Sequence, residues 1–451
     1  MPGPAPQMTE LKRELGLLDA TMINVGTMIA SAIFIVPATI ALQVQYSSLA
    51  VLVWIVGGIV SLLGALSVAE LGAAYPEAGG QYAYLREAYG PVWGYLYGWA
   101  GFAVINSASI AAIAVGFAQY LGFFVPLGPA AVKVVAILSI AALTVINCLG
   151  VRLGATVQNV LTFLKIGALA ALIVLSLVLP GGSPAHFAPV WPDGALGPLI
   201  APFGLAMVSA LWAYDGWIET TYVGSEIKNP GRNLPVSIIL STVIVIVLYV
   251  LVSTAYIYVV PIGRMAGSTL VASDAAQVLM GSVGATFVVI AILVSTLGSN
   301  NGIILTAARI PYAMARGGLF FRWGARVHPR FGTPVLALVT ESAVAAALTL
   351  TGTYVQLTTY VVFASFLFYA MSSGAVIRLR RTAPDLPRPY RTWGYPVTPI
   401  VFIAFATWLV GNTILEAPRD AAIGAGLILI GLPGYFYWKQ RLLPAPSRPV
   451  E

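Results

Sequence analysis

The stretch ALWAYDGWIETTYVGSE, residues 210–226, decides the fold because it places acidic side chains inside an apolar run. It contains Asp215, Glu219 and Glu226, with Gly216 near its centre. The whole chain is 59% hydrophobic and only 9% charged, whereas a soluble domain is about 25% charged. A carboxylate near the middle of a bilayer costs about 2.5–3.5 kcal/mol on insertion scales and usually faces a cavity or a partner. The stretch therefore predicts an interrupted membrane helix beside a cavity.

Apolar runs near 20 residues recur along the chain, and each is long enough to cross a hydrocarbon core of about 30 Å as a helix. The short alternating segments of a membrane barrel do not occur. We therefore predict an all-α integral membrane protein with twelve transmembrane helices. The expected spans are 17–43, 49–72, 91–122, 131–149, 154–179, 199–225, 234–260, 275–308, 334–351, 354–379, 397–415 and 420–440.

The distribution of basic residues supports this topology, because loops on the cytoplasmic side carry an excess of Lys and Arg. With a cytoplasmic amino terminus, the outside loops hold only Arg264 and Arg419, with Lys133 at the outer end of the fourth span. Both termini are then cytoplasmic. Orientation and contact with anionic lipids account for the net charge of +7, so no nucleic-acid partner is expected.

A second interruption is predicted in the first span, where Gly26 and Ser31 lie mid-span and Pro37 follows. The first and sixth spans open the first and second groups of five. Interrupted helices at matching positions of two halves indicate an inverted-repeat transporter with its substrate at the breaks. For the first span alone, small residues that allow close helix packing are an equally good explanation.

The motifs resemble those of a known family. INVGTMIASAIFIVP (residues 23–37) is similar to the first-span signature of the amino acid–polyamine–organocation superfamily. LWAYDGW (211–217) with GSEIKNPGRNLP (224–235) resembles the sixth-span signature of its L-type amino acid transporter branch, and RPYRTWGYPVTP (388–399) is similar to a superfamily pattern. The resemblance covers essentially the whole chain and implies a five-plus-five inverted-repeat (LeuT-like) fold with discontinuous helices 1 and 6.

This fold divides the chain into four parts: a cytoplasmic segment 1–16, a first repeat 17–190 (spans 1–5), a second repeat 191–380 (spans 6–10), and 381–451 with spans 11 and 12. Carried over by position, the resemblance implies that Ala30, Ser31 and Ala32 bind the substrate carboxylate. It implies carbonyl contacts to the ammonium group from Met28, Trp212, Ala213 and Asp215, with Trp212 also closing over the substrate. Phe366 on the tenth span is the implied side-chain pocket residue.

One departure concerns the residues that flank Ser31, which are glycines in the usual signature and Ala30 and Ala32 here. Alanine resists backbone conformations that glycine adopts freely. We therefore expect a tighter or less unwound carboxylate cradle.

The intramembrane acids allow several roles. Asp215 can attract a cationic substrate side chain, take up a proton, or act as a structural acid bonded to freed backbone N–H groups. Glu219 lies one turn further on the same face and stays unassigned, while Glu226 is expected in an ionic loop cluster with Lys228 and Arg232. Glu341 in the ninth span has no assigned role.

Lys165 is the only base deep inside a span. The sodium-independent members of the family are similar in placing a lysine on the fifth span where relatives hold sodium. The resemblance implies that its ammonium ties the first and eighth spans, with Ser295 and Ser299 as partners. The alternative is a lysine that reaches an interface.

The sequence thus predicts a sodium-independent exchanger of L-amino acids, neutral and possibly cationic, that works by alternating access. A proton-coupled symporter is the alternative, and a transporter-like sensor is less favoured. An enzyme is not expected, because His186 and His328 fall in loops on opposite sides and no cofactor or metal site stands out. The animal relatives are disulfide-linked to a heavy chain. The lone Cys148 lies within the fourth span, so we expect no such partner, and a monomer in a bacterial plasma membrane.

Overall fold

The computed structural model describes residues 10–194, 197–351, 354–416 and 418–441. Within these ranges the regular structure is helical and contains no strand, which confirms the all-α prediction. The first half holds α1 (Leu17–Met28), α2 (Ala32–Val44), α3 (Ser47–Ala74), α4 (Gln81–Tyr89), α5 (Pro91–Ala100), α6 (Asn106–Leu121), α7 (Pro129–Cys148) and α8 (Val151–Val178). A π-helical turn, Gly101–Ile105, joins α5 to α6.

The second half begins with α9, which is followed by short 3₁₀ turns instead of a helix. Its helices are α9 (Ile200–Ala213), α10 (Pro230–Val259), α11 (Ile262–Met265), α12 (Val271–Met280), α13 (Ser282–Ala307), α14 (Arg309–Arg316), α15 (Val335–Thr351), α16 (Tyr354–Thr382), α17 (Val397–Glu416), α18 (Pro418–Leu429) and α19 (Gly431–Arg441).

Nine helices within the described ranges are long and apolar enough to cross a membrane, or ten if the bent pair α1 and α2 forms one span. Two further apolar helices, Gly197–Ala213 and Val335–Leu350, are shorter. Large apolar side chains such as Leu138, Leu177 and Val247 are exposed on the outside of the bundle, as expected of a surface that faces lipid. The chain is therefore a multi-pass membrane protein.

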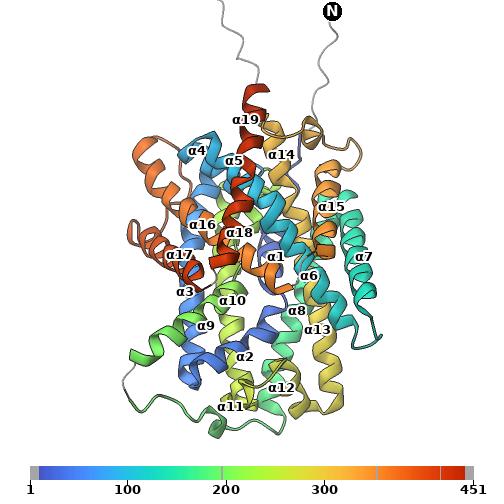
Figure 1. Ribbon diagram of the computed structural model, residues 1–451, viewed down its shortest axis with the longest axis vertical. Helices are drawn as coiled ribbons and strands as arrows, with labels where there is room; N and C mark the ends of the chain where they lie inside the picture. Colours follow the sequence, from blue (N-terminus) through green and yellow to red (C-terminus); the bar gives the residue numbers. More distant parts are fainter. Residues whose placement is uncertain (1–9, 195–196, 352–353, 417, 442–451) are drawn as a thin grey trace, which may run out of the picture.

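The helices form an elongated bundle with α14 and α19 at one end and α11 and α12 at the other (Figure 1). α1 lies inside the bundle, where it packs against α8, α10 and α13, and α2 packs against α9. The interrupted elements are therefore surrounded by long, continuous helices. This arrangement places any cavity at the breaks near the middle of the molecule.

Two predicted spans differ from the structure. The sixth was expected over 199–225, but α9 ends at Ala213 and the rest contains only the 3₁₀ turns Glu219–Thr221 and Gly224–Glu226. The eighth was expected over 275–308, but Gly281, with φ +63°, ends α12 and α13 begins only at Ser282. The sixth span ends close to the interruption predicted at Asp215 and Gly216, and what differs is that no α-helix follows the break. For the eighth span, apolar composition predicted one helix because it does not register a glycine in the left-handed region.

Candidate functional site

The two interrupted helices contact each other at their breaks. α1 ends at Met28 and α2 begins at Ala32, with a bend of 44° between them. Across the break, the Thr27 hydroxyl donates to the carbonyl of Gly216 at 3.1 Å. Gly216 has φ +115°, and a Cβ there would lie 3.0 Å from the Met28 backbone nitrogen. Only glycine combines this conformation with so close an approach.

Tyr249 of α10 bridges the ends of the two broken helices. Its hydroxyl lies 2.8 Å from the Met28 carbonyl and 3.2 Å from the Ala213 carbonyl. Carbonyls in the last turn of a helix have no partner within the helix. Tyr249 supplies one hydroxyl proton that the two carbonyls share. The Met28 carbonyl also accepts from the Ala30 N–H at 2.9 Å, whereas the Ala213 carbonyl keeps a lone pair for a further donor.

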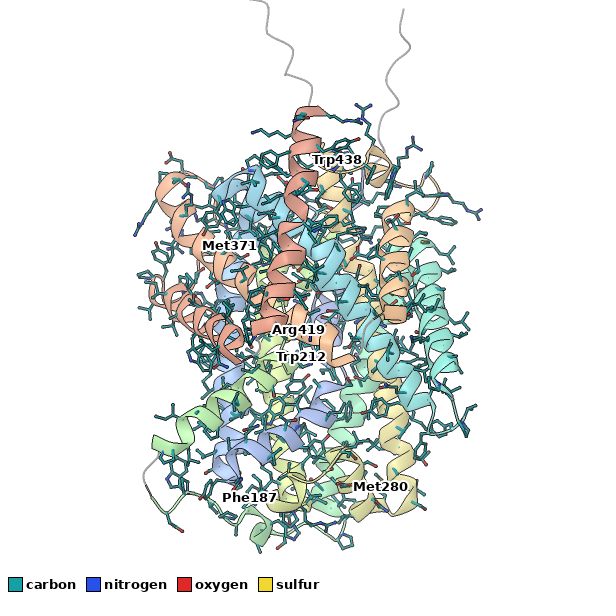
Figure 2. The ribbon with its side chains drawn as sticks, viewed as in Figure 1. Phe187, Trp212, Met280, Met371, Arg419 and Trp438 are labelled. Carbon is teal, nitrogen blue, oxygen red and sulfur yellow. The ribbon has the colours of Figure 1, made fainter. Side chains whose placement is uncertain are left out.

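A small cavity of about 60 Å³ lies between the breaks. That is the volume of about two water molecules, so little free space separates the two breaks in this structure. Figure 2 places Trp212 near the middle of the molecule, between Trp438 toward one end and Phe187 toward the other. Of the predicted substrate-binding residues, Met28, Ala30, Ser31, Ala32, Trp212 and Asp215 line the cavity, whereas Ala213 and Phe366 do not.

The N-terminus of α2 faces the cavity through Ser31 and Ala32. The first N–H groups of a helix have no intrahelical acceptor, and the helix dipole makes this end a favourable place for an anion. Among the described non-glycine residues only Gln45 and Asn229 have positive φ, so neither Ala30 nor Ala32 needs the conformation that favours glycine. This explains why alanine is accommodated on either side of Ser31.

Two carboxylates line the cavity and form no ion pair with any described residue. Asp215 Oδ1 accepts hydrogen bonds from the Tyr369 hydroxyl at 2.6 Å and from the Gly216 N–H at 3.0 Å. Glu219 accepts a hydrogen bond from the Thr306 hydroxyl. Asp215 thus does contact a freed backbone N–H, as its structural role requires. Its position in the cavity wall also leaves the other two roles available.

On α16 the cavity residue is Tyr369, one turn after Phe366. Phe366 is buried behind it, with the two rings packed edge to face at 5.6 Å between centroids. In this structure Tyr369 therefore lines the cavity, and Phe366 lies one helical turn earlier, outside its wall. The only sequence signal for Tyr369 was its hydroxyl, a polar group in the apolar run FASFLFYA that needs a partner when buried.

Sequence reasoning also missed Asn106, which lines the cavity at the start of α6. Its side chain is buried and its amide nitrogen has no hydrogen-bond partner among the described residues. Buried polar groups are normally paired, so this amide is available to a ligand or a water. The available signal was an asparagine in an otherwise apolar span, GFAVINSASI.

Lys165 lies behind the first break and does not line the cavity. Its ammonium group is within 2.7 Å of the Gly26 and Ile29 carbonyls and 2.9 Å of the Ser295 carbonyl, with Ser299 Oγ at 3.3 Å. Three carbonyls match the three donors of an ammonium group. The hydroxyls of Ser295 and Ser299 also donate to Ile29 and Gly26, both at 2.8 Å. The lysine is fully buried, which excludes the interfacial position.

Glu226 differs from its prediction. It is fully buried and pairs with Arg309 through two hydrogen bonds of 2.7 and 3.0 Å, instead of joining Lys228 and Arg232 in an exposed cluster. Arg309 NH1 also donates to the Leu305 carbonyl at 2.5 Å. Glu341 is likewise buried, and neither of its carboxylate oxygens has a hydrogen-bond partner in the ranges described.

An all-helical membrane protein that holds a polar cavity between two interrupted helices has the architecture of a secondary carrier. The chain belongs to the amino acid permease family, whose sequence profile matches residues 15–435. The predicted membership in the amino acid–polyamine–organocation superfamily is thereby confirmed.

Three relatives illustrate the match. The chain is 34% identical to the serine/threonine exchanger SteT of Bacillus subtilis (strain 168), over 96% of this chain and 98% of that protein. It is 34% identical to the rat b(0,+)-type amino acid transporter 1, over 99% and 92%. It is 33% identical to the rabbit large neutral amino acids transporter small subunit 2, over 96% and 82%.

Proposed function

We propose that the protein is a sodium-independent exchanger of L-α-amino acids that works by alternating access. The observation that carries the proposal is the cavity enclosed by both breaks, with a helix N-terminus and two unpaired carboxylates in its wall. A related bacterial protein is named as an exchanger, which favours exchange over proton-coupled uptake. The family and its named relatives are transporters, and this argues against an enzyme.

The cavity offers complementary surfaces to the two poles of a zwitterion. The N–H groups around Ser31 and Ala32 would bind the carboxylate, because the N-terminus of α2 favours negative charge. The carbonyls of Met28, Trp212, Ala213 and Asp215 would bind the ammonium group, and the Asp215 carboxylate would remain available to a cationic side chain of the substrate. Trp212 would close over the substrate, and a substrate larger than the present cavity would require it to move.

The topology in this proposal has twelve spans, with α9 and α15 completing the set and with repeats over 17–190 and 191–380. The excess of basic residues in the loops on one side supports cytoplasmic termini, and the proposed location is a bacterial plasma membrane. Cys148 is partly buried at the last residue of α7, a membrane helix in this topology, so no disulfide to a heavy chain is expected and the monomer would be the working unit.

Exchange is expected to proceed at equal rates in sodium and choline buffers, because the Lys165 ammonium already contacts the carbonyls at the first break. Radiolabelled substrate efflux from loaded proteoliposomes measures this directly. Efflux should require external amino acid and should not change when a pH gradient is imposed. A strict sodium requirement would overturn the role of Lys165. Efflux driven by the pH gradient alone would indicate symport, and no flux at all would indicate a sensor.

The Asp215→Asn variant tests whether this acid recognises cationic substrates. Because the carboxylate lines the cavity, its removal should weaken arginine uptake by about tenfold or more while leucine uptake changes little. Competition uptake of the two amino acids gives the ratio at several pH values. Unchanged selectivity and pH dependence would leave Asp215 with a structural role only.

A further inference from the structure

A groove of about 870 Å³ runs along the first turns of α10, away from the central cavity. Three separate parts of the chain form it: Arg13 of the N-terminal segment, residues 229–243, and Pro389 to Trp393. The N-terminal segment is held there by pairing with the stretch before α10, because the Leu15 and Glu14 N–H groups both donate to the Glu226 carbonyl at 2.9 Å. The groove therefore joins elements that are distant in sequence.

One wall of the groove is apolar and faces outward from the bundle. Val236, Ile239, Leu240 and Val243 follow one face of α10 at intervals of three and four residues. Val236, Leu240 and Val243 are exposed. Trp393, with 66% of its surface exposed, stands at the rim. In a membrane protein such a surface contacts acyl chains, and tryptophan is enriched at the level of the lipid headgroups.

The end of the groove nearest the start of α10 is basic. Arg13 and Arg232 both line it, both are exposed, and neither side chain has an ion pair or hydrogen bond with another described residue. Basic pockets between membrane helices on the cytoplasmic side bind acidic lipid headgroups. Two guanidinium groups without a partner among the described residues, at the end of an apolar groove, match an amphiphile with a negative head.

We propose that this groove binds one phospholipid with an anionic headgroup. Arg13 and Arg232 hold the phosphate and headgroup, and an acyl chain lies along α10 from Val236 to Val243. A zwitterionic lipid gains less from the two guanidinium groups, because its own cation opposes them. A free phosphate leaves the apolar wall uncovered.

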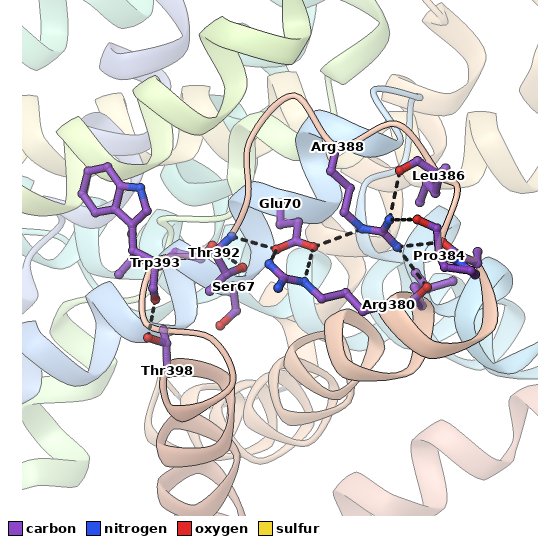
Figure 3. Close-up of polar contacts among 12 residues, drawn as sticks. Ser67, Glu70, Arg380, Pro384, Leu386, Arg388, Thr392, Trp393 and Thr398 are labelled. Atoms are coloured by element: carbon purple, nitrogen blue, oxygen red, sulfur yellow. Dashed lines mark hydrogen bonds and ion pairs between the residues drawn. The ribbon is translucent and has the colours of Figure 1, made fainter.

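The bound lipid would connect three parts of the chain that are distant in sequence. The wall formed by Pro389 and Tyr390 belongs to a loop that Glu70 of α3 holds in place (Figure 3). Glu70 accepts from Arg380 at 2.9 and 2.6 Å and from the Thr392 N–H at 2.7 Å, and Arg388 lies at 3.3 Å. A lipid across the groove links this anchored loop to the N-terminal segment and to α10.

Titration of the purified full-length protein in detergent, read by native mass spectrometry, tests the site without any transport assay. The probes are dioleoylphosphatidylglycerol, dioleoylphosphatidylcholine and inorganic phosphate. We expect one tightly held phosphatidylglycerol per chain and weaker retention of phosphatidylcholine. The unfolding temperature should rise with phosphatidylglycerol and not with inorganic phosphate. A rise with inorganic phosphate alone would identify an anion site and overturn the lipid assignment.

Two pairs of variants separate the headgroup from the acyl chain. Arg13→Gln with Arg232→Gln should weaken phosphatidylglycerol binding roughly 20-fold. Arg152→Gln with Arg381→Gln removes the same charge from exposed positions outside the groove and should have no effect. Val236→Trp should fill the channel and abolish binding. Val247→Trp, three turns further on the same exposed face but outside the groove, should not.

Equal phosphatidylglycerol retention by the wild type and the Arg13→Gln, Arg232→Gln protein would overturn the proposal. So would equal weakening by both arginine pairs, which would indicate a general surface-charge effect. All four proteins are checked for a monomeric elution profile before titration. The Val236→Trp result, which leaves every charge in place, then decides the case if the arginine double variant is poorly folded.

Discussion

Replacing Lys165 with methionine is expected to reduce amino acid exchange by about 100-fold or more. The change removes a donor group shared by three carbonyls at 2.7–2.9 Å, in a site with no solvent access. Loss of a hydrogen bond from a charged donor to a buried acceptor costs about 1.5–3 kcal/mol. Three carbonyls lose such a bond here. The Gly26 and Ile29 carbonyls would lose the contact that fixes the first break. Exchange in proteoliposomes, normalised to the amount of inserted protein, measures the loss.

Chemical rescue distinguishes a specific cation site from general damage. Lys165→Ala leaves a space lined by the same carbonyls, so sodium or methylammonium in the buffer should restore part of the exchange. Lys133→Met is the matched control, because Lys133 contacts a single carbonyl, that of Leu350, at an exposed position. Wild-type rates in Lys165→Met would contradict the proposed role, and so would an equal loss in Lys133→Met.

Replacing Arg309 with leucine is expected to destabilise the fold by about 3–5 kcal/mol, because it leaves the buried Glu226 carboxylate without its ion-pair partner. The expected signs are a lower unfolding temperature in detergent and a smaller fraction of monodisperse protein on size exclusion. The double variant Glu226→Gln, Arg309→Gln removes both charges and should recover a large part of the loss.

The control lies on the same helix. Arg316 also forms an ion pair, with Glu10 at 3.4 Å, but both side chains are exposed (37% and 78%). Such surface pairs contribute about 0–1 kcal/mol, so Arg316→Leu should change the unfolding temperature little. If the two arginine variants unfold at the same temperature, the buried pair does not have the assigned energetic role.

The break positions were predictable from sequence because their causes are local. Gly216 adopts a backbone conformation that a helix excludes, and Asp215 beside it is too polar for a lipid-facing position. The extent of the helices followed from apolar length, since a bilayer requires about 20 residues to cross. Local signals failed at Gly281, which divides an apolar run into two helices, and after the second break, where 3₁₀ turns replace the expected helix.

The side chains in the cavity wall were less predictable, because they depend on how distant helices pack. Phe366 and Tyr369 both lie on α16, and only the rotation of that helix decides which one meets Asp215. From the sequence, Glu226 could pair with the nearby Lys228 or Arg232, or with the more distant Arg309. Its actual partner is the one 83 residues away. Pairings of this kind are set by tertiary geometry, which composition and spacing do not encode.

The π-helical turn at Gly101–Ile105 determines the direction in which the Asn106 side chain points. Such a turn holds one residue more than an α-turn, so Asn106 points about 100° away from where an unbroken helix starting at Pro91 would aim it. The direction of its amide, which has no hydrogen-bond partner among the described residues, is thus set by the number of residues in the preceding turn. If this turn became α-helical with all its residues retained, the amide would rotate away from the cavity, whereas deletion of one residue from the turn would leave Asn106 facing it.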